Sequence, residues 1–129
     1  EARAVLLEKL GFPIADWKGA GETGSYFKPE RTMNYFLQVG EGDTVIEIIV
    51  PQDATSGAAK FLAKRGPGLH HIGYAVDDVE EEAARLTDQG LRRVDLGPRA
   101  GAAFFYPQGV HGVLTEFVPY RNPGARLHT

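Results

Sequence analysis

Apolar residues gather in two strand-like runs in the first half of the chain. These runs, Met33–Val39 and Thr44–Val50, flank the glycine-containing connection Gly40–Asp43, an order that is typical of a β-hairpin. Two shorter stretches, Ile14–Trp17 and Ser25–Phe27, lie between turn-forming residues. The first half is therefore predicted to hold a hairpin preceded by two brief strands.

Three segments have the composition and spacing of apolar residues that favour a helix. The first is followed by Gly11 as a stop, and the third has Asp78 as its N-cap, Glu81 three residues later in a capping box, and Gly90 at its end. These features mark helix boundaries. The predicted helices are Ala2–Leu10, Ala54–Arg65 and the segment from Val79 to Gly90.

A strand that holds two adjacent histidines is predicted between the second and third helices, in Gly68–Val76. With a period of two, His71 shares a face with Gly73 and Ala75, so its imidazole is expected to look across two small residues into open space. The other face is apolar around its own histidine. Its members are His70, Ile72, Tyr74 and Val76.

The second half of the chain repeats the order of elements found in the first. After the third helix, strand-like runs lie at Arg93–Leu96, Ala102–Tyr106 and Val113–Val118. Helix, strand, strand, strand therefore occurs twice. A constant offset of 69 residues places Glu47 on Glu116, each near the middle of the last strand of its half.

Comparison of the two halves predicts the organisation of the chain. We expect one domain over residues 1–129, with module one at 1–51, a linker helix at 52–67, module two at 68–120 and a tail at 121–129. Module two opens with the histidine strand, whereas module one begins inside its helix. A strand of about ten residues is therefore expected upstream of Glu1, and a histidine in it would add a further ligand to any site.

The composition is that of an ordinary globular domain, with 129 residues and 43% hydrophobic content. A net charge of -3 provides no basic field for a phosphate backbone, so nucleic acid is not an expected partner. No apolar run approaches membrane-spanning length, and no membrane association is expected. The chain has no cysteine, which excludes thiolate chemistry and fits a reducing cytoplasm.

Three residues suggest a metal site: Glu47, His71 and Glu116. Each glutamate is centred on an otherwise apolar strand face, where a carboxylate is costly to desolvate unless a positive group meets it. A divalent cation satisfies that requirement with one imidazole and two carboxylates. We expect Co2+ first, with Mn2+, Ni2+ or Zn2+ as alternatives.

Simpler interpretations stand beside the metal site. A lone glutamate in a strand is as often at a sheet edge or paired with arginine as it is a ligand, so Glu47 or Glu116 alone would decide nothing. His70 is expected to be a packing or hydrogen-bonding histidine because of its apolar face, whereas His71 is favoured as a ligand. Phe104 is expected to form core or cavity wall.

Five motifs resemble the vicinal oxygen chelate superfamily (glyoxalase, bleomycin resistance protein and dioxygenase), and within it most closely the methylmalonyl-CoA epimerases. Together they cover most of the chain from Glu30 onward. They are DTVIEIIVP, AKFLAKRGPG, GLHHIGYAVDDVEEEAARL, PRAGA and HGVLTEFVP. The resemblance implies an α+β fold in which two βαβββ modules form curved mixed sheets around a metal-centred cleft, and it implies a homodimer.

The resemblance also implies roles for individual residues. His71, Glu47 and Glu116 match the positions of metal ligands, and Glu30, in the Pro29-Glu30 pair, matches a glutamate that is proposed as one of two proton-transferring bases. Glu116 is the candidate for the second base. The implied activity is a metal-dependent epimerase that acts by 1,1-proton transfer through a metal-stabilised enolate, on methylmalonyl-CoA or a similar acyl thioester.

Other activities remain open within the same fold. A glyoxalase-type lyase acting on a hemithioacetal would use similar ligands and similar enediolate chemistry. A metal-free protein that binds a small molecule, as in drug resistance, would use the cleft without a cation. A ring-cleaving dioxygenase would depend on ferrous iron and oxygen.

Overall fold

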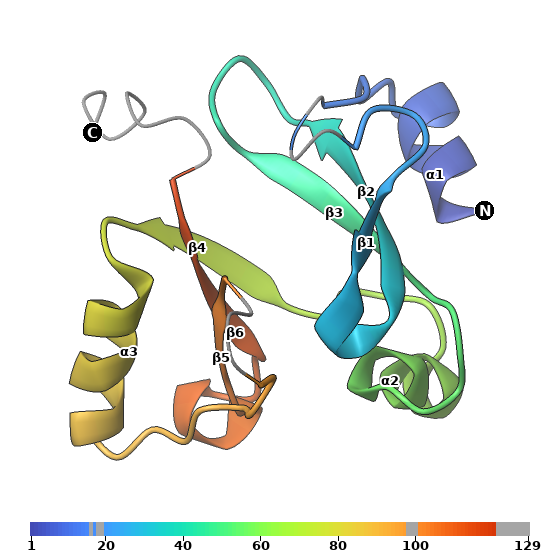
Figure 1. The fold of residues 1–129 in the computed structure, drawn as a ribbon. Coiled ribbons are helices and arrows are strands. Elements are labelled where there is room, and N and C mark those ends of the chain that lie inside the picture. The colour runs from blue at the N-terminus through green and yellow to red at the C-terminus, as the bar shows by residue number, and fades with distance from the viewer. Residues whose placement is uncertain (16, 18–19, 98–100, 121–129) are drawn as a thin grey trace. The chain divides into compact units, whose positions relative to one another are not determined.

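The computed structural model describes residues 1–15, 17, 20–97 and 101–120. These residues form two compact units that divide between Gly66 and Pro67, and each unit contains one three-stranded sheet together with helices (Figure 1). The α+β class expected from the sequence is confirmed. The boundary lies inside the predicted linker 52–67, and its helix belongs to the first unit. The predicted tail 121–129 and residues 98–100 of the PRAGA motif lie outside the described residues.

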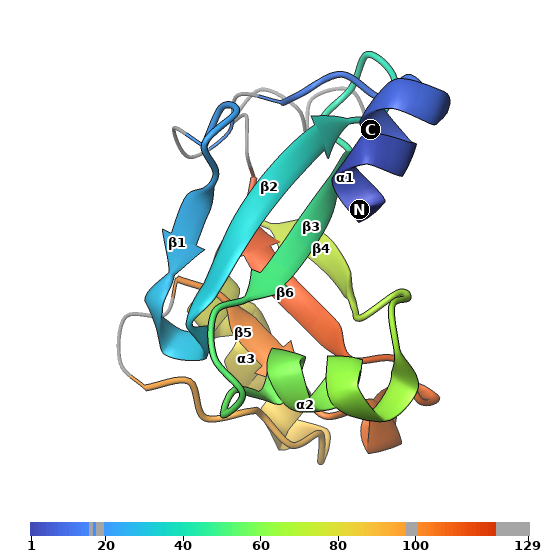
Figure 2. The same cartoon turned by 90° about the vertical axis from the view of Figure 1, so that its right-hand side faces the viewer.

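The sheet of the first unit is an antiparallel meander in the order β1-β2-β3 (Figure 2). Its second pair is the hairpin predicted from the two strand-like runs, with each strand displaced by one residue. Phe36 lies directly opposite Glu47 in that pair. The strands are β1 (Ser25–Phe27), β2 (Thr32–Gln38) and β3 (Val45–Pro51).

Helical segments precede and follow this sheet. The predicted first helix is present as α1 (Ala2–Ala4) and a π-helical continuation, η1 (Val5–Lys9). A single 3-10 turn, η2 (Lys28–Glu30), separates β1 from β2, and the sequence pattern did not predict it. The predicted strand at Ile14–Trp17 is reduced to one bridge between Ile14 and Leu37 among the residues described there.

The second helix, α2 (Gly57–Arg65), begins three residues later than predicted. Ser56 is its N-cap, and the Ser56 hydroxyl oxygen accepts a hydrogen bond from the Ala59 N–H at 3.1 Å. An N-cap serine has extended backbone angles, so the helix cannot include the residues before it. The preceding residues instead form a turn in which the Thr55 N–H donates to the Asp53 carboxylate.

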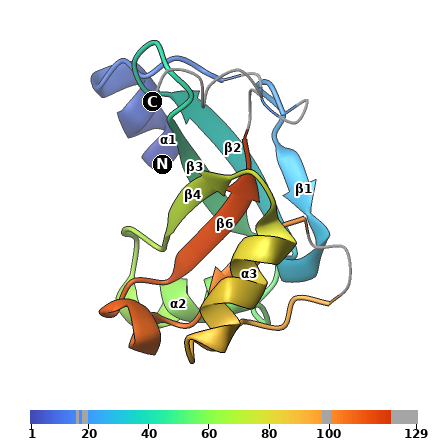
Figure 3. The same ribbon diagram turned by 90° about the vertical axis from the view of Figure 1, so that its left-hand side faces the viewer.

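The sheet of the second unit combines parallel and antiparallel pairing. Its order is β4-β6-β5, with β4 parallel to β6 and β5 antiparallel to β6. A parallel pair needs a long connection, and α3 lies within that connection and packs on β5 and β6 (Figure 3). The elements are β4 (Ile72–Val76), α3 (Val79–Asp88), β5 (Ala103–Phe105), η3 (Pro107–Val110) and β6 (Thr115–Pro119).

The boundaries of α3 follow the predicted capping residues. The Asp78 carboxylate accepts a hydrogen bond from the Glu81 N–H at 2.9 Å, and Gly90 has the positive φ of a residue that ends a helix. The apolar face of α3 covers the sheet through Ala83, which contacts Ala103 and Phe105 in a buried cluster. The predicted strand at Arg93–Leu96 is only a bridge between Arg93 and Phe105.

None of the described helices is long and apolar enough to cross a membrane. The longest of them, α3, has 10 residues, whereas a membrane span needs about 20.

The internal repeat is present, but one strand is a residue out of step with the predicted offset. In the first unit, Phe36 lies opposite Glu47, whereas in the second unit Phe104, and not Phe105, lies opposite Glu116. The two isolated bridges agree with this shift, because Leu37 pairs with Ile14, before β1, and Phe105 pairs with Arg93, before β5. A one-residue shift exchanges the faces of a strand, so Phe104 shares the face of Glu116.

The apolar face of β4 is not part of the buried core. Ile72 and Tyr74, which lie on it, are both exposed. The buried apolar contacts of the second unit come instead from α3, β5 and β6.

Phe105 is expected to dominate the stability of the second unit because it is 1% exposed and lies at the centre of the α3 cluster. Phe105→Ala should lower the free energy of unfolding by about 3–5 kcal/mol, since it removes a buried ring and leaves a cavity. Urea unfolding measures this. Leu69→Ala is the control, because Leu69 is 79% exposed and its change should be within about 0.5 kcal/mol. Equal losses of unfolding free energy in the two variants would contradict the packing of Phe105 in this cluster.

Candidate functional site

The centre of the candidate site is a contact between an imidazole and a carboxylate in the second unit. His71 directly precedes β4, and Glu116 is the second residue of β6. The His71 Nε2 and the Glu116 Oε1 are 3.0 Å apart, and the two side chains are only 8% and 16% exposed. A largely buried carboxylate requires a hydrogen-bond donor or a cation, and His71 supplies the first.

A glycine leaves room beside this pair. Gly73 lies opposite Glu116 in the parallel ladder, and a Cβ atom at Gly73 would be only 2.9 Å from the Glu116 Oε1. The small residue predicted next to His71 therefore has a specific consequence. The absence of a side chain at Gly73 leaves space for the Glu116 carboxylate oxygen on the neighbouring strand.

An aromatic ring borders the pair on another side. The rings of His71 and Phe104 meet edge to face with their centroids 5.2 Å apart. Phe104 is in β5 directly opposite Glu116. It thus forms part of the wall, as the sequence predicted, and its apolar surface excludes water and strengthens electrostatic interactions at the site.

His70 is the hydrogen-bond partner of His71. The two Nδ1 atoms are 2.9 Å apart. The pKa of His70 is lowered to about 4, first by burial and then by the nearby His71, while Glu116 partly opposes both effects. His70 is therefore neutral near pH 7, and its Nδ1 is able either to donate to His71 or to accept from it, depending on the tautomer. This agrees with the hydrogen-bonding role expected for His70.

In the first unit, Glu47 is held by an amide that the sequence analysis did not single out. The Asn34 Nδ2 donates to the Glu47 Oε2 at 3.1 Å, and Asn34 is only 8% exposed. Asn34 and Phe36 lie on the β2 face that Glu47 shares. Asn34 is polar and lies two positions before Phe36, so it shares a strand face with Phe36. This pattern could have identified Asn34 from the sequence. The contact orients the Glu47 carboxylate.

Glu30 lies elsewhere in the first unit, at the beginning of α2. Its Oε1 accepts a hydrogen bond from the Ala58 N–H at 3.3 Å, and it also lies close to Gly57. The N-terminal N–H groups of a helix attract anions, so this is a favourable place for a carboxylate. Glu30 is thus oriented by the backbone of another element.

The structure brings two of the four predicted site residues together within one unit, namely His71 and Glu116. Glu47 and Glu30 both belong to the first unit, where one is on β3 and the other is at the N-terminus of α2. The donor atoms suit a divalent cation, because imidazole nitrogen and carboxylate oxygen are common ligands of Zn2+, Co2+, Mn2+ and Ni2+. The absence of a side chain at Gly73 also leaves space for the Glu116 carboxylate oxygen.

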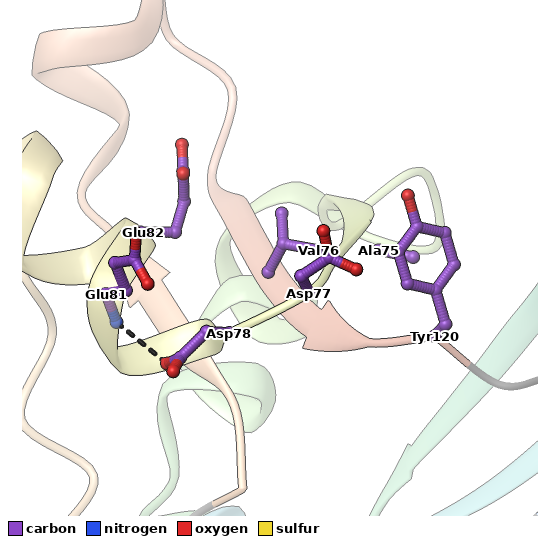
Figure 4. A pocket seen from close by; sticks show the side chains of 7 residues that line it. All are labelled: Ala75, Val76, Asp77, Asp78, Glu81, Glu82 and Tyr120. Atoms are coloured by element: carbon purple, nitrogen blue, oxygen red, sulfur yellow. Dashed lines mark hydrogen bonds between the residues drawn. The ribbon is translucent and has the colours of Figure 1, made fainter. Parts of the chain in front are cut away.

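The second unit also contains a pocket with a largely acidic lining (Figure 4). It has a volume of about 380 Å³ and is bordered by four acidic residues. Among them, Asp78 caps α3 and Glu82 pairs with Arg85. Such a surface repels an anionic substrate. Its lining is Ala75, Val76, Asp77, Asp78, Glu81, Glu82 and Tyr120.

Two curated relatives resemble the chain in sequence. The first is "Uncharacterized protein YqjC" of Bacillus subtilis, which is 39% identical over 58% of this chain and 57% of its own length. The second is "Methylmalonyl-CoA epimerase, mitochondrial" of Dictyostelium discoideum, which is 34% identical over 60% of this chain and 51% of its own length. The chain thus spans little more than half the length of these relatives.

A solved structure resembles the chain in fold. The methylmalonyl-CoA epimerase of Mycobacterium tuberculosis superposes with a TM-score of 0.77 and 27% sequence identity, over 97% of this chain and 82% of that one. The mixed α/β content and the two small sheets match this fold.

A family model gives the broadest agreement. The model described as the glyoxalase/bleomycin resistance protein/dioxygenase superfamily matches residues 4–106, a range that includes Glu47 and His71 and ends before Glu116. The chain belongs to the glyoxalase/bleomycin resistance protein/dioxygenase superfamily.

Proposed function

We propose that this protein is a metal-dependent epimerase that inverts a carbon centre by 1,1-proton transfer, on methylmalonyl-CoA or a similar acyl thioester. The observation that carries the proposal is the buried His71–Glu116 pair beside the space at Gly73. The likeness to methylmalonyl-CoA epimerases in sequence and fold supports the choice of reaction.

The proposed ligands of the metal ion are Glu47, His71 and Glu116, which together offer one imidazole and two carboxylates. We propose Co2+ as the ion, with Mn2+, Ni2+ or Zn2+ as alternatives. When bound, a divalent ion would act as a Lewis acid on substrate oxygen and stabilise negative charge that develops next to the thioester.

Two neighbouring groups support the proposed ligands. When His71 presents its Nε2 to a cation, its proton resides on Nδ1, and the neutral His70 accepts it in a hydrogen bond. Asn34 holds one oxygen of Glu47 in the same way that a supporting amide orients a ligating carboxylate. Because both side chains would already be held in place, they would lose little conformational entropy on binding the ion.

The proposed proton-transferring bases are Glu30 and Glu116. Inversion needs one base on each side of the α carbon, because the proton leaves from one face and returns to the other. Glu30 would serve one face from the start of α2, and Glu116 would serve the other while also contacting the ion. A carboxylate that is held by a backbone N–H, as Glu30 is, keeps one orientation through the cycle.

We further propose that the protein is a cytoplasmic homodimer. The composition without cysteine is compatible with a reducing compartment. Sedimentation equilibrium would measure the mass in solution, and a monomer at micromolar concentration would contradict the dimer.

The reaction itself predicts solvent exchange. With metal, the protein incubated with (2R)- or (2S)-methylmalonyl-CoA in D2O should introduce deuterium at the α position of either epimer. Mass spectrometry of the recovered thioester follows the label, and a reaction without protein corrects for spontaneous exchange. Lack of enzyme-dependent exchange with both epimers would remove the epimerase proposal.

The ligand set predicts which variants lose the metal. Glu47→Gln, His71→Ala and Glu116→Gln should each weaken binding of Co2+ by more than the roughly 10- to 100-fold that is typical for loss of a supporting group. Gly73→Ala should also weaken it, since the added Cβ would displace the Glu116 carboxylate. Competition with a chromogenic chelator measures the affinity, and Glu41→Gln in the hairpin connection is the control. Unchanged affinity in all four variants would place the metal elsewhere.

The superfamily also includes proteins of other activity. Assays of the same purified protein distinguish these activities from that of an epimerase. A glyoxalase-type lyase would convert the hemithioacetal of methylglyoxal and a thiol, and a metal-free binding protein would be isolated without an equivalent of metal. For an epimerase we expect close to one divalent ion per chain by elemental analysis and no turnover of the hemithioacetal. Rapid turnover of the hemithioacetal would favour the lyase instead.

A further inference from the structure

The turn that holds Glu30 is fastened to the beginning of α2 by two consecutive side chains. Glu30 accepts a hydrogen bond from the Ala58 N–H. The next residue, Arg31, donates from its Nε to the Asp53 carboxylate at 2.8 Å and from its second guanidinium nitrogen to the Thr55 hydroxyl at 2.8 Å. Glu30 and Arg31 thus make one side-chain contact with the first turn of α2 and two with the segment before it.

The backbone of Arg31 has the conformation that this connection requires. Its φ and ψ are 52° and 51°, in the left-handed region that a residue with a side chain seldom adopts. In this conformation the Arg31 carbonyl also accepts a hydrogen bond from the Gln52 N–H at 2.9 Å. An unfavourable local conformation persists where surrounding contacts compensate for it. Here those contacts hold the η2 turn and thereby orient the Glu30 side chain.

Gly57 provides the space in which the Glu30 carboxylate lies. A Cβ atom at Gly57 would be 2.9 Å from the Glu30 Oε1, which is closer than unbonded atoms of this kind approach. The helix itself does not require glycine there. Gly57 is the first residue of α2, it does not have a positive φ, and alanine favours a helix more than glycine does.

We propose that Gly57 is a positioning residue for Glu30, and that the absence of a side chain at this position allows the start of α2 to aim the carboxylate for proton transfer. The inference rests on the proposed function. Ala58 supplies the donor, Ser56 fixes the start of the helix, and Gly57 leaves the path between Glu30 and that donor open. One oxygen of Glu30 is then held by the helix and the other is available to the substrate.

The test is Gly57→Ala, assayed by deuterium exchange with each epimer of methylmalonyl-CoA separately. Because each base removes the proton of one epimer, misplacing Glu30 should slow exchange of a single epimer, on the order of 100-fold for a displacement of about 1 Å. Glu30→Gln should slow exchange of that same epimer. A purely structural defect would slow both epimers alike.

The matched control is Gly42→Ala, which adds the same methyl group in the same unit at a glycine with nothing within 4 Å of the added atom. Its exchange rates should equal those of the unaltered protein for both epimers. The double variant Gly57→Ala with Glu30→Gln should be no slower than Glu30→Gln alone, because Gly57 acts only through Glu30.

The stability of Gly57→Ala distinguishes positioning from a backbone requirement. Its Tm should equal or exceed that of the unaltered protein, since alanine replaces glycine in a helix. A strong loss of stability would overturn the inference, as would equal exchange rates in Gly57→Ala and the unaltered protein, or equal slowing of both epimers. If the unaltered protein exchanges neither epimer, the proposed function fails instead.

Discussion

The constraint on which the candidate site depends is the removal of the Glu116 carboxylate from water. A carboxylate in an apolar strand is unfavourable unless a donor or a cation compensates for the lost hydration. His71 compensates for it at 3.0 Å, Gly73 leaves the space in which the oxygen lies, and Phe104 covers one side. His70 then holds the His71 ring from its other nitrogen. Every feature of this site follows from accommodating one buried charge.

The same principle operates in the first unit with different partners. Glu47 is held by the buried amide of Asn34, and Glu30 is held by the N-terminal backbone of α2. In each case one carboxylate oxygen is engaged by the protein. An acid held in this way loses little conformational entropy when it meets a ligand, which is the property that metal sites and general bases share.

The internal repeat explains why carboxylates of similar surroundings occur in both halves of the chain. Glu47 and Glu116 occupy corresponding places on the last strand of each sheet, and each lies opposite a phenylalanine. The two halves differ in the side chain that contacts the glutamate. The first unit places an amide next to its glutamate, whereas the second places an imidazole there. The repeated order of elements thus supplies the scaffold, and differences in single neighbouring residues supply the site.

Residue pattern alone determined the elements that depend on local interactions. The hairpin of β2 and β3, the cap of α3 at Asp78 and the identity of the partly buried strand glutamates all follow from neighbours close in sequence. Only the tertiary structure decided the register that puts Phe104 rather than Phe105 beside Glu116, the partnership of Asn34 with Glu47, and the contact of Glu30 with α2. These depend on chain segments that are far apart in sequence. A one-residue change of strand register reverses which face a side chain occupies, and local propensities do not fix that register.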